Sequence, residues 1–137
     1  MAAVANIVIN DGAATPVAHT FAPSRQSGDL FEWNDRAAGV AAGFNKISVL
    51  TRYGTSSNAG QRVTLKVIAP TLAVTAPTSG SGVQPNPVAA YTALATIEFL
   101  IPNASDAAAR ANIHAFVKNL VATTFVENMI KNLDAPF

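Results

Sequence analysis

Two segments in the middle of the chain alternate between the two faces expected of β-strands. The first covers residues 46–53 and places on one side Lys46, Ser48, Leu50 and Arg52. The second covers residues 62–67 and places on one side Arg62, Thr64 and Lys66. The intervening positions are mostly apolar, and this period of two predicts strands with one packed and one polar face. A turn rich in Gly, Ser and Asn (54–60) separates them, so we expect them to be neighbours.

The charges of this region are strongly segregated. No acidic residue occurs between Asp35 and Glu98, whereas the two predicted strands carry four cations on their polar sides. The formal net charge of the whole chain is only +1, so the total conceals this imbalance. A flat basic sheet face without compensating carboxylates favours binding of a polyanion such as nucleic acid. The alternative is an ordinary solvated surface.

Composition bounds the class of protein. With 137 residues the chain is expected to form a single domain, 1–137. Half of its residues are hydrophobic and only 12% are charged, which favours apolar surface buried between subunits over tight packing of Ala-rich helices. No cysteine is present, which excludes disulfides and thiolate metal sites. No signal peptide or membrane span is expected, so we predict a soluble protein synthesised in the cytoplasm.

Strands fill the first three quarters of the predicted fold. An N-terminal hairpin (1–22) should contain strands at 4–10 and 17–21, joined by a tight turn at Asp11-Gly12. After a loop at 23–28, a main sheet (29–101) should contain strands at 30–33, 45–53, 61–69, 72–75 and 88–101. Pro70 is expected to end or bend the strand before it. The uncharged loop 77–87 contains three prolines and is of a length that is often functional.

The hydrophobic period changes after Pro102 and predicts two helices within 105–133. Ser105 is the expected N-cap, with Asp106 near the positive end of the helix dipole. Thr123-Thr124 offers a break and a second cap. The order of strands followed by helices predicts an α+β fold with an antiparallel sheet. Two consecutive helices with almost no linker cannot easily cover their own sheet, so we expect them to interlock with a partner subunit in a dimer.

Three stretches carry a resemblance to a known family through their order, spacing and length. They are Lys46-Ile-Ser-Val-Leu-Thr-Arg52 with Arg62-Val-Thr-Leu-Lys-Val67; Pro87-Val-Ala-Ala-Tyr91 leading to Ile97-Glu-Phe-Leu-Ile-Pro102; and Asn119-Leu-Val-Ala-Thr-Thr-Phe-Val-Glu-Asn-Met-Ile-Lys-Asn-Leu133. These stretches resemble the two central strands, the long last strand and the helical end of the coat proteins of single-stranded RNA bacteriophages of the levivirus type. The resemblance spans nearly the whole chain.

The resemblance implies a fold and a function. The family fold is an N-terminal β-hairpin, a five-stranded antiparallel sheet and two C-terminal helices that interlock with those of a partner. It implies a homodimer that tiles an icosahedral shell, binds single-stranded genomic RNA on its inner sheet face, and can repress translation through an RNA hairpin. It further implies contact with a maturation protein, a location in the virion capsid, and assembly in the cytoplasm of a bacterial host.

The same resemblance assigns the RNA-contacting positions. The expected RNA-binding residues are Lys46, Ser48, Arg52, Arg62, Thr64, Lys66 and Thr96. Leu50 and Leu94 depart from the family, which has polar or aromatic side chains there for hairpin recognition. The expected attraction of phosphates does not depend on these two positions.

Other chemistry is weakly supported by the sequence. His19 and His114 are far apart and are expected to be surface or packed residues, so no metal or other cofactor site is predicted. Glu98 is expected to balance a cation such as Arg62 or Lys66, because it has no partner carboxylate for general-acid chemistry. The sequence also has no nucleophile elbow, so an enzyme is not predicted. The rival functions are a stand-alone dimeric RNA-binding regulator and a small α+β enzyme or ligand-binding domain, for which a concave pocket would be needed.

Overall fold

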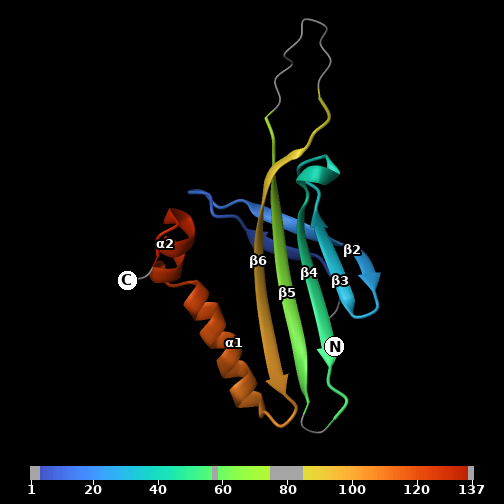
Figure 1. Ribbon diagram of the computed structural model, residues 1–137, viewed down its shortest axis with the longest axis vertical. Helices are drawn as coiled ribbons and strands as arrows, with labels where there is room; N and C mark the ends of the chain where they lie inside the picture. Colours follow the sequence, from blue (N-terminus) through green and yellow to red (C-terminus); the bar gives the residue numbers. More distant parts are fainter. Residues whose placement is uncertain (1–3, 57–58, 75–84, 136–137) are drawn as a thin grey trace, which may run out of the picture.

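The computed structural model describes residues 4–56, 59–74 and 85–135, and has six antiparallel strands followed by two helices (Figure 1). The strands follow each other in the sheet in chain order. Their bounds are β1 Ile7–Asn10, β2 Ala18–Ser27, β3 Leu30–Asp35, β4 Asn45–Tyr53, β5 Gly60–Leu72 and β6 Ala89–Pro102. The other elements are a 3₁₀ turn, η1 Ala41–Gly43, and the helices α1 Ala107–Val121 and α2 Thr124–Asn132. The predicted α+β class with two C-terminal helices is confirmed.

The hairpin and the main sheet share a strand, which the sequence did not predict. β2 pairs with β1 through its first half and with β3 through its second half, so six strands replace a separate hairpin and five-stranded sheet. The segment 23–28, predicted as a loop, is therefore strand as far as Ser27. A register shift between Pro23 and Arg25 accommodates Pro23, which has no backbone N–H to donate to the neighbouring strand. Gly28, with a φ of 58°, then begins the turn to β3.

Three further strand predictions need correction. The turn after β1 is wider than a two-residue hairpin, because Asp11 Oδ1 accepts hydrogen bonds from the backbone N–H groups of Ala13 and Val17. β5 continues through Pro70 to Leu72 and pairs with β6 along that length, so Pro70 does not end it. No strand forms at Ala73 or Val74, and most of the predicted loop 77–87 lies outside the described residues.

The core of the described chain is small and lies under the N-terminal hairpin. Its buried hydrophobic side chains are Phe21, Trp33 and Ile47, from β2, β3 and β4. The indole N–H of Trp33 donates to the Ala5 carbonyl at 2.9 Å, which fastens the N-terminal segment to the sheet. The hairpin thus covers the apolar face only over β3 and β4.

Both helices begin at side-chain caps. α1 lies to one side of β6, and α2 follows at the far end of α1 (Figure 1). Asp106, and not Ser105 as predicted, is the N-cap of α1 and accepts from the Ala109 N–H at 2.7 Å. The Ser105 hydroxyl donates instead to the Pro102 carbonyl. Thr123 caps α2 as predicted, accepting from the Val126 N–H at 3.4 Å. No residue of α1 or α2 is buried in the protomer, and no helix in the described part of the chain is long and apolar enough to cross a membrane.

Candidate nucleic-acid interface

The register of the central strands brings the predicted cations to one face of the sheet. Arg52 lies directly opposite Arg62, and Ser48 lies directly opposite Lys66. Lys46 is two residues from Ser48 on β4 and therefore shares this face, opposite Ile68. β6 adds Thr96 opposite Lys66 and Glu98 opposite Thr64. All seven residues predicted to bind RNA thus lie on one surface, here called the basic face.

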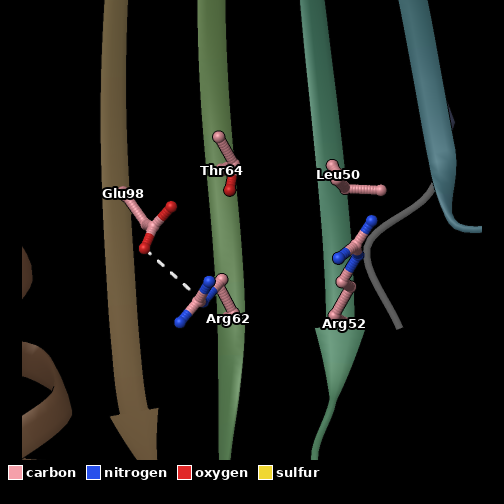
Figure 2. Close-up of a pocket in the computed structure, with 5 residues that line it drawn as sticks. All are labelled: Leu50, Arg52, Arg62, Thr64 and Glu98. Atoms are coloured by element: carbon pink, nitrogen blue, oxygen red, sulfur yellow. Dashed lines mark ion pairs between the residues drawn. The ribbon is translucent and has the colours of Figure 1, made fainter.

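Arg52 and Arg62 line a shallow hollow in this face (Figure 2). Its volume is about 160 Å³, and it is completed by Leu50, Thr64 and Glu98. Like charges directly opposite each other on neighbouring strands repel. Glu98 reduces this repulsion, because its Oε1 lies 3.5 Å from Arg62 Nε in an exposed ion pair. The predicted pairing of Glu98 with a cation is therefore present, and Arg62 is its partner.

The other three predicted cations of the basic face have no carboxylate partner in the described part of the chain. Within residues 4–56, 59–74 and 85–135, Lys46, Arg52 and Lys66 form no ion pair with a carboxylate. Lys66 is half-buried, whereas Lys46 and Arg52 are exposed. Positive charge held on a rigid sheet without an internal partner is suited to an anion from outside the chain.

β2 and β3 add charges that the sequence reasoning missed. Glu32 lies opposite Ser48 and so belongs to the basic face, and its carboxylate is 4.0 Å from Arg25 Nε. The cations of β4 and β5 therefore have a carboxylate on each flank, Glu32 on one side and Glu98 on the other. Arg25 was not assigned to a strand because Pro23 suggested a loop, and the uninterrupted polar run at residues 24–27 has no apolar alternation that would indicate a strand.

Aliphatic side chains complete the basic face. Leu94 lies opposite Ile68 and is 62% exposed, and Leu100 lies opposite Arg62 and is 61% exposed. Such side chains cannot form hydrogen bonds with base edges, which carry the direct sequence information in RNA. Of the seven residues predicted to bind RNA, Ser48, Thr64 and Thr96 are uncharged and can form hydrogen bonds through their hydroxyls. This face therefore offers four cations to phosphates, whereas base edges could meet only hydroxyls and the amide of Asn34, opposite Lys46, among the neutral polar side chains named here.

The opposite face of β5 and β6 is apolar and remains open. Val63, Leu65, Phe99 and Ile101 form a groove of about 290 Å³ together with Arg110, Ile113 and His114 of α1. The far parts of the helices extend beyond this groove with their apolar side chains in solvent. Phe116 and Ile130, for example, are each 67% exposed.

His19 lies in a polar cluster that the sequence did not reveal. Its Nδ1 is 2.6 Å from Asp35 Oδ2, and its Nε2 is 3.5 Å from Asp11 Oδ2. The hydrogen bond to Asp35 raises the pKa of His19 above its usual value. Burial would raise the pKa of Asp35, but hydrogen bonds from His19, the Ala37 N–H and the Asn45 amide lower it below its usual value. Among the described residues, no group of three His, Cys, Asp or Glu side chains is arranged to hold a metal ion.

Comparison with known proteins gives one family. Residues 2–137 match the family model described as "Levivirus coat protein". The virus-like particle of bacteriophage ESE058 is similar at 27% identity and a TM-score of 0.89, covering 99% of this chain and 100% of that one. The virus-like particle of bacteriophage NT-214 is similar at 26% identity and a TM-score of 0.85, with the same coverage. The capsid protein of bacteriophage GA shares the fold at 20% identity, with a TM-score of 0.76 and 96% coverage of each chain. No curated protein sequence matches the chain.

Proposed function

Because the chain belongs to the levivirus coat protein family, we propose that it forms a homodimer that binds single-stranded genomic RNA on its basic face. The chain is a structural capsid protein and not an enzyme, and it assembles with copies of itself into the shell of a virion. The homodimer, the RNA and its binding residues are the parts that we infer. They rest on the arrangement of charge and apolar surface in the described residues.

The observation that carries the RNA-binding proposal is the shared face of Lys46, Arg52, Arg62 and Lys66. Four cations within two paired strands form a rigid positive surface about as wide as two strand spacings. Each phosphate that a cation neutralises releases counterions, so affinity should fall steeply with salt concentration. Ser48, Thr64 and Thr96 can add hydrogen bonds to phosphate or sugar oxygens.

The dimer proposal rests on apolar surface that one protomer leaves open. The groove between α1 and the sheet is lined on one side by Val63, Leu65 and Phe99. Leu120 of α1, Phe125 of α2 and the C-cap residue Leu133 are 58%, 58% and 89% exposed. Among the described strands β6 is the last of the sheet, so its outer edge can pair with a strand of another copy. A second copy could lay its helices over this groove and pair its own sheet with the edge of β6. We propose that this assembly takes place in the cytoplasm of a bacterial host.

Recognition of a single RNA hairpin, and with it translational repression, would need contacts to bases. Leu50 on β4 and Leu94 on the edge strand β6 belong to the basic face and cannot provide polar contacts. We therefore propose that RNA is held mainly through its phosphates, with Thr96 as the polar side chain on β6 available to a base. Contact with a maturation protein in the completed virion belongs to the same proposal.

The charge-reversal variant Lys46→Glu/Lys66→Glu tests the RNA-binding face. Dimers and their thermal stability should be retained, while particles should contain less RNA and dimers should bind RNA with a salt slope reduced by about two. Arg36→Glu/Lys118→Glu is the matched control, because it changes the net charge equally at exposed sites outside the six strands. Equal loss of RNA in both variants would indicate a net-charge effect, and unchanged RNA content in the first variant would refute the proposed face.

A further inference from the structure

His19 connects the tip of the N-terminal hairpin to the main sheet at a place where the backbone ladder has ended. β2 pairs with β3 only from Ser27 back to Ala22, so His19 lies beyond the last backbone pair with β3. Its side chain continues the connection, with Nδ1 2.6 Å from Asp35 at the end of β3. Its other ring nitrogen faces Asp11, in the turn after β1, at 3.5 Å.

The protonation of the imidazole decides how many of these contacts can be attractive. Imidazolium donates from both nitrogens, whereas neutral imidazole has one N–H and one lone pair. The shorter contact, to the buried Asp35, assigns the remaining proton of the neutral ring to Nδ1. Nε2 would then present its lone pair to the Asp11 carboxylate, and that contact would become repulsive.

We propose that His19 is a pH-sensitive clip that holds the N-terminal hairpin on the sheet when the imidazole is charged and loosens the hairpin tip when it is neutral. Asp11 transmits the change, because its Oδ1 also accepts the N–H groups of Ala13 and Val17 and so organises the turn. Asp35 is fixed at the other end by the Ala37 N–H at 3.0 Å and the Asn45 amide at 3.3 Å. The change is therefore concentrated in the hairpin and not in β3 or β4.

The charges facing His19 give the direction of the effect. Among the described residues these are Asp11 from the hairpin turn and Asp35 from β3, while β4 contributes only the neutral amide of Asn45. Two carboxylates around one imidazole favour its charged form, in agreement with the raised pKa of His19. The clip is complete below the usual histidine pKa of about 6.5 and is lost as pH rises through the higher pKa of the folded protein.

Hydrogen exchange on the full chain between pH 5.5 and 9.5 tests the clip, with rates corrected for the intrinsic pH dependence of exchange. Protection of amides in β1 and the first half of β2 should fall about two- to fivefold as His19 titrates, since its pair with Asp11 is partly exposed. Protection in β4 should not change. Ring NMR signals of His19 locate the titration. Hairpin protection that stays constant across it would overturn the proposal.

Two variants separate the clip from general effects of pH. His19→Gln should remove the change in hairpin protection. Asp11→Asn keeps an oxygen acceptor for the turn, and its amide can donate to the Nε2 lone pair of neutral His19. Protection should therefore persist at alkaline pH in Asp11→Asn, even if His19→Gln lowers hairpin stability at every pH. A loss of protection in Asp11→Asn as large as in the unmodified chain would contradict the mechanism. This test involves no RNA and is independent of the proposed RNA-binding face.

Discussion

Arg52 and Arg62 lie directly opposite each other on β4 and β5, and among the residues that the structure describes only Arg62 of the two is paired with a carboxylate, that of Glu98. The two guanidinium groups therefore differ in availability although they belong to one hollow (Figure 2). Arg52 can bind a phosphate directly, whereas Arg62 must first break its ion pair with Glu98 or share its guanidinium between Glu98 and the phosphate. Glu98 thus limits how strongly the basic face attracts an anion.

Replacing Glu98 by Gln should increase RNA affinity. Without its carboxylate partner, Arg62 becomes available to a phosphate, so the salt slope of binding should steepen by about one. The gain in affinity at low salt should be up to about fivefold, because an exposed ion pair contributes little. Binding of RNA by purified dimers across a salt series measures both quantities.

Glu127→Gln is the control for the Glu98 variant. It removes the same charge on α2, where Glu127 pairs with Lys131 four residues later, away from the basic face. Its RNA affinity should change far less than that of Glu98→Gln. Weaker binding in Glu98→Gln would mean that the Glu98 side chain itself contacts the RNA.

A charged residue on the apolar side of α2 should prevent dimer formation. Ile130 is 67% exposed in the protomer, so Ile130→Asp would be tolerated if the protein functioned as a monomer. In the proposed dimer the new carboxylate is buried without a partner, at a cost of several kcal/mol. Sedimentation and size-exclusion chromatography should show loss of dimers and particles. Asn128→Asp, on an exposed position of the same helix, should assemble normally.

The alternation of polar and apolar residues was sufficient to predict the cations of the basic face, but not the residues of β2 and β3 around it. Alternation alone placed Lys46, Arg52 and Lys66 on one side, because a strand has only two faces and both strands are regular. Arg25 was not predicted to lie on a strand, because Pro23 suggested a loop where β2 in fact continues through a bulge. The contact between His19 and Asp35 could not be predicted either, since it depends on how β2 leaves the ladder with β3.

The ends of the elements were also harder to predict than their existence. Both Ser105 and Asp106 are good N-cap residues, and the sequence does not decide between them. The choice depends on the exit of β6, where the Ser105 hydroxyl reaches the Pro102 carbonyl and leaves Asp106 to cap α1. Similarly, Pro70 remains within β5, so of the two expectations, that it would end or bend the strand, the first is wrong.

The two candidate caps can be separated by substitution. Asp106→Ala should destabilise the protein by about 1 kcal/mol, since it removes the acceptor for the Ala109 N–H at the start of α1. Ser105→Ala should cost less, because the Ser105 hydroxyl only adds a donor to the exposed Pro102 carbonyl. Urea denaturation at one fixed protein concentration compares the two variants. A larger loss for Ser105→Ala would contradict the assignment of the cap.

The free energy of unfolding at acidic pH should depend on Asp35. Its pKa is lowered in the folded protein despite burial, because hydrogen bonds from His19, the Ala37 N–H and Asn45 favour the carboxylate. A lowered pKa contributes stability above the usual aspartate pKa of about 3.9, and this contribution is lost as pH falls through the folded pKa. Asp35→Asn should therefore cost about 2 kcal/mol near pH 5.5 and progressively less below pH ~3.9. Urea denaturation at a series of pH values measures the difference, and Asp29→Asn, at an exposed turn position, should show none. A cost that is the same at every pH would mean that Asp35 acts through its shape and not through its charge.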